Sequence, residues 1–155
     1  MKGLARKFGE DEHKWAIAGL LHDLDWDKTK DNPQRHSLEA CEILQDLGID
    51  SEICEAIKKH NDRHGIEPET LLDKALLAGE TYTGFITACA LVQPDKKLAQ
   101  VSVESAMKKF KNKSFAAGAN RELMQRSQEL IGMSVEEMIA LCLKEMQGIA
   151  GELEL

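Results

Sequence analysis

The chain has 155 residues, which is enough for one domain with a hydrophobic core. Apolar residues make up 43% of the sequence, charged residues 30% and aromatic residues only 5%, so we expect a globular protein whose core is built from Leu, Ile, Ala and Met. The net charge of -7 argues against a general affinity for nucleic acid or for an anionic membrane, and it leaves room for a small anionic substrate held by a local cation or metal ion.

The spacing of apolar residues follows the helical period along the chain. In chain order it predicts helices over residues 2–8, 11–24, 36–47, 51–61, 69–92, 102–111 and 120–131, with a final helix after residue 134. The expected ends are Gly9 and Gly48, and the expected caps are Asp50, Asn120 and Ser134, the last in a capping box with Glu137. Residues 25–35 are expected to form a loop, and residues 111–120 an irregular or short-helical segment. No segment alternates as a half-buried strand would, so the predicted fold class is all-α, with about seven to eight helices.

Neither the cysteines nor the N-terminus points to secretion. Four cysteines allow two disulfides, but none forms a CxxC pair and each lies beside apolar neighbours, so we expect reduced core thiols in a cytoplasmic protein. The N-terminal stretch MKGLARKFGEDEH has no apolar signal core, and no run approaches the ~18 apolar residues of a membrane span. We therefore expect no membrane partner.

The stretch GLLHDLDW, residues 19–26, places an imidazole beside a carboxylate at the end of an apolar helix. His22, His36, His60 and Glu80 all fall on apolar faces, each on a different predicted helix. A single inward histidine is usually a hydrogen-bonded core residue, and burying each group uncompensated costs about 1–3 kcal/mol. Convergence on a metal ion would satisfy all four, because imidazole nitrogen and carboxylate oxygen suit Zn, Mn, Fe or Ni. From spacing alone, the metal site and the hydrogen-bonded core both stay open.

The residues Gly19-Leu20-Leu21-His22-Asp23, followed by His36 and His60, resemble the HD-domain superfamily of metal-dependent phosphohydrolases. The stretches HSLEACEIL, AIKKHNDRHG, KALLAGETYTGFI, LVQPDKKL and KKFKNKSFAAGANRE resemble an uncharacterised bacterial branch of it, so the similarity covers nearly the whole chain. The resemblance implies a single HD domain over residues 1–155, a compact helical bundle with the metal site in its core.

The resemblance also implies roles for individual residues. His22 and Asp23 would bind a divalent metal ion (Mn, Fe, Ni, Zn or Mg), and Asp23 would be catalytic, orienting water or bridging two ions. His36 and His60 match histidines of members that hold a second metal ion. Glu80 takes the place of the family's last ligand, an aspartate, and its longer side chain shifts the carboxylate.

The family's metal set opens with a histidine on an earlier helix. The one histidine before His22 is His13, which lies nine residues away on the same predicted helix. That spacing corresponds to about 13 Å of helical rise, so the two side chains do not easily reach one ion. Residues 1–9 resemble the tail of the earlier helix, so we expect the chain to start after the first ligand. A second copy of the chain, in a homodimer, is one arrangement that would fill the gap.

A phosphorylated substrate, with nucleotides among the candidates, needs cationic partners. The expected substrate-binding residues are Arg35, Lys59, Arg63 and His64. Further basic residues lie at Lys108, Lys109, Lys111, Lys113 and Arg121, where a solvated helix end is the competing interpretation. Asp25 and Asp27 are interpreted as turn residues rather than ligands. Trp26 either packs over the site or stacks on a base.

Three functions are compatible with these residues. The leading hypothesis is an enzyme, a metal-dependent phosphohydrolase that hydrolyses a phosphate ester with a metal-activated water. The alternative is a degenerate HD domain that binds a ligand or partner without catalysis, as the first-ligand gap and Glu80 would allow. The third is a helical interaction domain whose inward histidines are only hydrogen-bonded.

Overall fold

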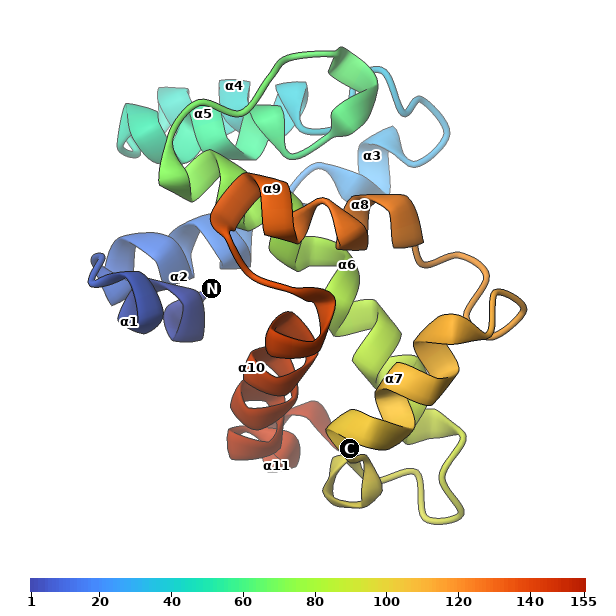
Figure 1. Cartoon of the computed structure of the whole chain (residues 1–155). Coiled ribbons are helices and arrows are strands. Elements are labelled where there is room, and N and C mark those ends of the chain that lie inside the picture. The colour runs from blue at the N-terminus through green and yellow to red at the C-terminus, as the bar shows by residue number, and fades with distance from the viewer. The chain divides into compact units, whose positions relative to one another are not determined.

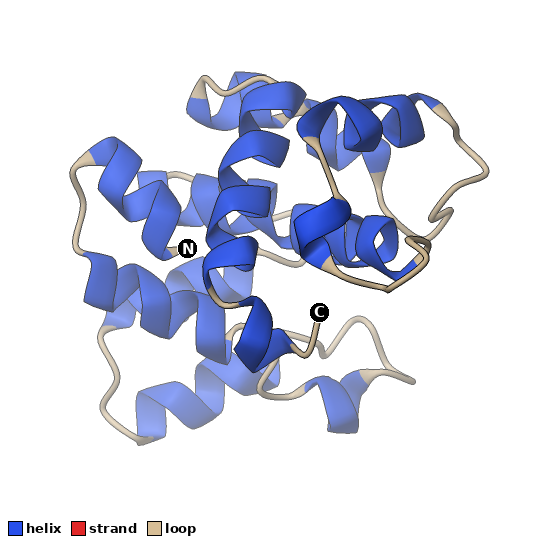
Figure 2. Cartoon of the chain, turned by 90° about the horizontal axis from the view of Figure 1, so that it is seen from below, coloured by secondary structure: helices blue, strands red, loops and turns tan.

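The computed structural model describes residues 1–155, and all of its regular elements are helical (Figures 1 and 2). The predicted all-α class is confirmed. Eleven α-helical segments are present, and two of them, α3 and α11, are only four residues long. The chain divides into two compact units, Met1–Leu77 and Ala78–Leu155. None of the helices combines the length and the apolar character needed to cross a membrane.

The first unit is built around α5. It contains α1 (Lys2–Phe8), α2 (Glu12–Leu21), α3 (Trp26–Thr29), α4 (Leu38–Asp46), α5 (Ser51–Lys59) and the 3-10 turn η1 (Asp62–His64). Helix α5 packs against both α2 and α4, while α1 packs against α2. Trp15 and Leu44 are buried in this unit, and so are Ile53 and Ile57. Full burial of an aliphatic side chain such as Leu44, Ile53 or Ile57 stabilises the fold by about 1.5–3 kcal/mol.

The helix limits of this unit follow local capping chemistry. The Asp11 carboxylate accepts hydrogen bonds from the backbone N–H groups of His13 and Lys14, and Asp50 accepts one from Glu52. Gly9, at a φ of 74°, ends α1 in the left-handed conformation that glycine tolerates. Helix α2 ends at Leu21, earlier than expected, and the predicted loop 25–35 contains α3. A single helical turn is too short to produce a recognisable apolar period, so the spacing of apolar residues does not predict α3.

Helix α6 (Leu71–Leu91) spans the boundary between the two units. Its start lies in the first unit and is capped reciprocally by Thr70 and Asp73. The Asp73 carboxylate accepts from the backbone N–H of Thr70, and the Thr70 hydroxyl accepts from the backbone N–H of Asp73. The predicted helix over 69–92 therefore begins two residues late and ends one residue early.

The second unit contains the rest of α6, followed by η2 (Leu98–Gln100), α7 (Val103–Lys111), α8 (Arg121–Gln125), α9 (Ser127–Ile131), α10 (Val135–Gly148) and α11 (Ala150–Leu153). Helix α10 packs against α7, η2, α9 and α11. The predicted caps at Asn120 and Ser134 are both present, the latter as a capping box with Glu137. The helix expected over 120–131 is divided at Arg126 into α8 and α9, although no glycine or proline marks the break.

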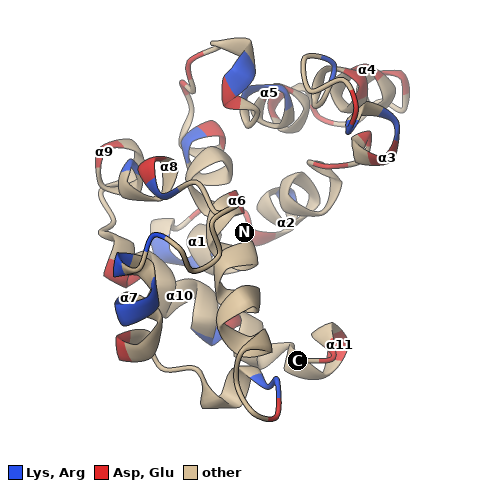
Figure 3. Cartoon of the chain, turned by 90° about the vertical axis from the view of Figure 1, so that its right-hand side faces the viewer, with Lys and Arg blue, Asp and Glu red and all other residues tan.

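Arg121 organises the segment 111–120, which was expected to be irregular. Its guanidinium donates to the backbone carbonyls of Phe110, Asn112, Phe115, Ala116 and Ala119. It also lies over the Phe85 ring, 5.6 Å from the centroid. The guanidinium donors are engaged by backbone carbonyls, so Arg121 stabilises this loop and is not available to bind an anion. The lysines of α7 are the basic residues that colour this helix in Figure 3.

All four cysteines are free thiols, and Cys41, Cys54 and Cys89 are buried. Burial raises the pKa of the Cys41, Cys89 and Cys142 thiols to about 11. These groups therefore stay protonated at neutral pH and behave as small apolar core residues.

Candidate metal centre

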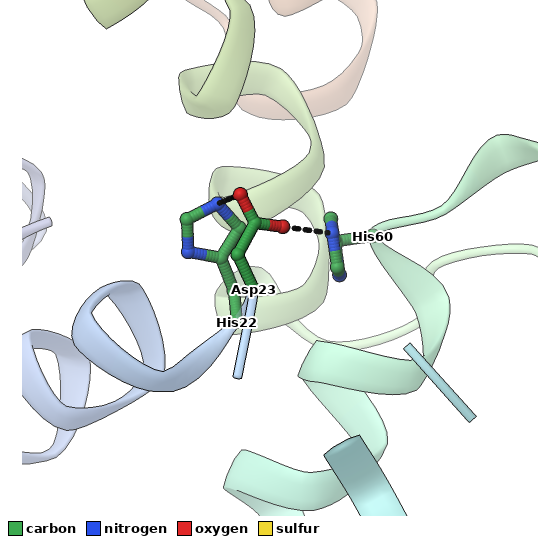
Figure 4. A group of neighbouring side chains, drawn as sticks. All are labelled: His22, Asp23 and His60. Atoms are coloured by element: carbon green, nitrogen blue, oxygen red, sulfur yellow. Dashed lines mark ion pairs between the residues drawn. The ribbon is translucent and has the colours of Figure 1, made fainter. Parts of the chain in front are cut away.

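The Asp23 carboxylate lies at the meeting point of three histidines in the first unit. Its Oδ2 is 3.3 Å from Nε2 of His22, and its Oδ1 is 3.3 Å from Nε2 of His36 and 3.6 Å from Nε2 of His60. His22 ends α2, His36 precedes α4 and His60 ends α5, so three helices that pack together deliver the rings. Figure 4 shows Asp23 between His22 and His60.

Burial within this cluster is graded. The side chain of His60 is 1% exposed, that of His36 10%, that of His22 22% and that of Asp23 47%. The His60 ring lies 5.1 Å, between centroids, from the rings of both His22 and His36. The histidines thus lie on the more buried side of the cluster, and the carboxylate is its most solvent-exposed member.

The other ring nitrogen, Nδ1, of each histidine is already engaged. Nδ1 of His22 lies 2.9 Å from the Gly19 carbonyl oxygen, and Nδ1 of His60 lies 2.5 Å from that of Ile57. Nδ1 of His36 lies 2.9 Å from Oδ1 of Asp25. Carbonyl and carboxylate oxygens only accept, so each Nδ1 carries the proton and donates it. In a neutral imidazole this places the lone pair on Nε2, the nitrogen that faces Asp23.

This arrangement brings three nitrogen lone pairs and an anionic carboxylate together. Lone pairs and carboxylate oxygens repel one another unless a proton or a cation lies between them. One potential ligand atom from each of His22, Asp23 and His60 lies within 4.8 Å of the other two. Nε2 of His36 lies near the same Asp23 oxygen, Oδ1, as Nε2 of His60. A donor set of imidazole nitrogens and one carboxylate fits a divalent ion such as Zn, Fe, Mn or Ni.

When no ion is bound, protons on the imidazole rings can balance the charge of the Asp23 carboxylate instead. His60, as a hydrogen-bond donor, is the main cause that lowers the pKa of Asp23 below its ordinary value. Partial burial acts in the opposite direction, and electrostatic attraction from His22, His60 and His36 lowers the pKa further. The carboxylate is therefore ionised at neutral pH and available as a ligand.

Asp25 is a buried partner of His36 that the sequence pattern does not reveal. It starts α3, as a turn residue would, but its side chain is fully buried. Its Oδ1 accepts from His36, and its Oδ2 accepts from the backbone N–H of Ala40 at 3.1 Å. The Thr29 hydroxyl, which donates to the Asp25 carbonyl, lies 3.4 Å from the same His36 nitrogen. Asp25 thus fixes the ring orientation of His36, as carboxylates do for metal-binding histidines.

Trp26 lies beside this buried network. Its indole is half-exposed, and its ring meets that of His36 edge-on with centroids 5.1 Å apart. This position agrees with the expectation that Trp26 packs over the site. Stacking on a base stays a prediction.

The basic residues expected to bind substrate are engaged to different degrees. The buried Lys59 ammonium lies 2.9 Å from carboxylate oxygens of both Asp73 and Glu69. Arg35 pairs with Glu39 and Glu42, and Arg63 is exposed in η1. His64 faces the protein with Nε2, which is 2.7 Å from the His36 carbonyl oxygen.

Glu80, the fifth expected metal ligand, is exposed on α6 and belongs to the second unit. It is not one of the clustered ligand atoms of the first unit. Its role as a ligand stays a prediction.

The HD-domain family model matches residues 1–147 of the chain. No curated protein and no solved structure matches the chain.

Proposed function

Because this chain belongs to the HD-domain family, a superfamily of metal-dependent phosphohydrolases, we propose that it hydrolyses a phosphate ester at a divalent metal site formed by His22, Asp23, His36 and His60. The observation that carries the proposal is the convergence of three Nε2 lone pairs on the ionised Asp23 carboxylate, with each Nδ1 already hydrogen-bonded. A core of neutral, merely hydrogen-bonded histidines would not place three acceptor nitrogens against an anion.

When bound, a divalent ion supplies Lewis acidity toward phosphoryl oxygens and an activated water at neutral pH. The histidines would hold it from the buried side, and Asp23 would complete the set from the solvent side. Oδ2 of Asp23 faces His22, whereas Oδ1 faces His36 and His60, so the two oxygens of the carboxylate lie against different histidines. This division supports the expectation that Asp23 bridges two ions.

In the proposed reaction, the water oxygen forms a bond to phosphorus and the ester P–O bond breaks. The leaving alcohol oxygen takes up the proton that the water loses. Asp23 is the catalytic residue, because its half-exposed carboxylate orients the attacking water by accepting a hydrogen bond from it. The buried histidines exclude solvent from the other side.

The substrate would be a small phosphorylated molecule, with nucleotides as candidates. Arg63 is the most accessible of the expected cationic contacts, and Arg35 would have to share its charge with Glu39 and Glu42. Lys59 would act at a distance, because its ammonium is held by Asp73 and Glu69. Nδ1 is the nitrogen of His64 left for a substrate. We also propose Glu80 as a further oxygen ligand, the cytoplasm as the location and a homodimer as the assembly.

The first test is the metal content of the purified chain, measured by elemental analysis beside the double variant His22→Ala, Asp23→Ala. His13→Ala is the matched control, because His13 is exposed at the start of α2 and away from Asp23. We expect near-stoichiometric metal in the wild type and in the control, and its loss in the double variant. The absence of metal from the wild type, even after adding it back, would contradict the proposal.

Turnover then separates catalysis from binding. Metal-loaded protein is tested against nucleotides and simple phosphomonoesters, with release of inorganic phosphate as the readout. Metal-dependent release that fails in the double variant supports a phosphohydrolase. Stoichiometric metal without turnover of any phosphate ester would instead favour a degenerate HD domain that only binds.

A further inference from the structure

The segment that follows His60 contacts the backbone of another proposed ligand, His36. Asn61 is buried immediately after His60, and its side-chain amide donates to the carbonyl oxygens of Pro33, at 3.0 Å, and His36, at 3.1 Å. Its amide oxygen accepts from the backbone N–H of Arg63 and so caps the turn η1. Asn61 therefore links the end of α5 to the segment that enters α4.

His64, at the end of η1, reaches the same carbonyl. Its Nε2 lies 2.7 Å from the His36 carbonyl oxygen, which only accepts, so this nitrogen carries a proton and donates it. Both amide hydrogens of Asn61 are donated to carbonyl oxygens, those of Pro33 and His36, so neither is available to the His64 ring. The His36 carbonyl oxygen thus accepts from two donors, Asn61 and His64.

Ser37 shows why this segment needs to be held. Its φ of 70° places a non-glycine residue in the left-handed region, directly after His36 and at the start of α4. The side chain is fully buried, and its hydroxyl donates to the Lys58 carbonyl while lying 3.0 Å from Nε2 of His64. A backbone in this conformation persists only where its surroundings fix it, and such positions concentrate at functional sites.

We propose that His64 is a positioning residue of the metal centre, which acts with Asn61 by holding the His36–Ser37 backbone so that the His36 ring reaches Asp23. Asp25 orients the ring of His36, and the pair Asn61 and His64 sets the position of its main chain. Ligand and support come from one short segment, His60–His64. The inference rests on the proposed metal site, since positioning has meaning only if His36 binds an ion.

The test is Co²⁺ binding by the full chain, followed through the visible absorption of the bound ion, whose intensity and position report the ligands. The variants are His64→Gln, His64→Asn and His64→Leu. The side-chain nitrogen of Gln lies close to the position of Nε2, whereas that of Asn lies near Nδ1. We expect Gln to bind Co²⁺ as the wild type does. Asn and Leu should weaken binding by about 10-fold or more, as loss of a supporting contact does, and should alter the spectrum.

The outcomes distinguish the two proposals. Failure of the wild type to bind Co²⁺ overturns the metal site and the positioning role together. A wild type that binds, with all three variants equal to it, overturns the positioning role alone. Equal loss in all three also overturns that role, because the donor at Nε2 would then not be the cause. If the Leu variant fails to fold, the comparison of Gln with Asn decides the matter, since both are polar.

Discussion

Two buried polar clusters of the first unit differ in the source of their positive charge. In the first, the Lys59 ammonium donates to Asp73, whose carboxylate also accepts from Thr70 and from the backbone N–H of Glu69. In the second, three imidazoles direct acceptor nitrogens at Asp23. The first cluster contains a lysine as its cation, whereas the second balances its carboxylate only by protonation of a histidine or by binding an ion. Neighbouring residues, Lys59 and His60, belong to one cluster each.

Burial of polar groups alone therefore does not identify a binding site. The balance of donors and acceptors does, because a cluster with enough donors is complete as part of the fold. Changes that remove a charge from either cluster should therefore have separate effects, one on folding and the other on metal binding.

The largest expected effect is that of Lys59→Met. It leaves the Asp73 carboxylate, 1% exposed, without its cation, so the free energy of unfolding should fall by about 3–5 kcal/mol. Urea denaturation measures the change, and Lys58→Met, at a half-exposed position of the same helix, is the control. A loss no larger than that of the control would show that the pair does not stabilise the fold.

The second cluster should respond to added metal. An ion that binds only the folded chain raises the unfolding free energy by about 2.7 kcal/mol when its concentration is 100 times the dissociation constant. We expect this gain for the wild type and for Lys58→Met, measured by thermal unfolding with and without a chelator. His60→Ala should abolish it. An equal gain in His60→Ala would contradict the assignment of this histidine as a ligand.

Asp25→Asn should have an intermediate effect on metal affinity. The amide carries no charge and has one acceptor oxygen, so it cannot accept from both the His36 ring and the Ala40 backbone N–H, and the dissociation constant should rise about 10–100-fold. Asp27→Asn is the matched control, because Asp27 lies in the same turn and is exposed. Metal titration by calorimetry gives both values. Equal constants for the two variants would remove Asp25 from the site.

The smallest expected effect is a pH dependence of the first cluster. Burial raises the pKa of Asp73, but hydrogen bonds from Thr70, Lys59 and the backbone outweigh it and hold the pKa below the ordinary value of 3.8. A carboxyl whose folded-state pKa is depressed adds stability above its unfolded pKa and loses it as the pH falls through the folded value. Stability should therefore decline below about pH 4 to 5, with the decline reduced in the double variant Lys59→Met, Asp73→Leu. Denaturation at several pH values tests this, and parallel curves would contradict it.

Much of the cluster around Asp23 could be predicted from the sequence. His22, His36 and His60 fall on apolar helical faces, where an unexplained polar residue is conspicuous, and the order of motifs resembles the HD domain. Asp25 could not be found in this way. It lies between Asp23 and Asp27 in a run of acids at alternate positions, and nothing in that pattern distinguishes the buried carboxylate from the exposed one.

The supporting contacts were hidden because they depend on distant partners. Lys59 looks like a free cation until the fold brings Asp73, 14 residues later, to its ammonium. His64 and Asn61 look like loop residues until the His36 carbonyl, 28 and 25 residues earlier, is placed against them. Helix caps are predictable because donor and acceptor lie within one turn, and contacts of this longer kind are not.

The two tryptophans have opposite surroundings, and this gives the protein an optical reporter. Trp15 is 2% exposed, whereas Trp26 is 50% exposed with its ring 5.1 Å from that of His36. Emission from Trp26 should therefore lie at longer wavelength and be quenched by a paramagnetic ion held by the histidines. Emission from Trp15, shielded in the core, provides an internal reference. Occupancy of the site can thus be followed in the unlabelled chain by fluorescence.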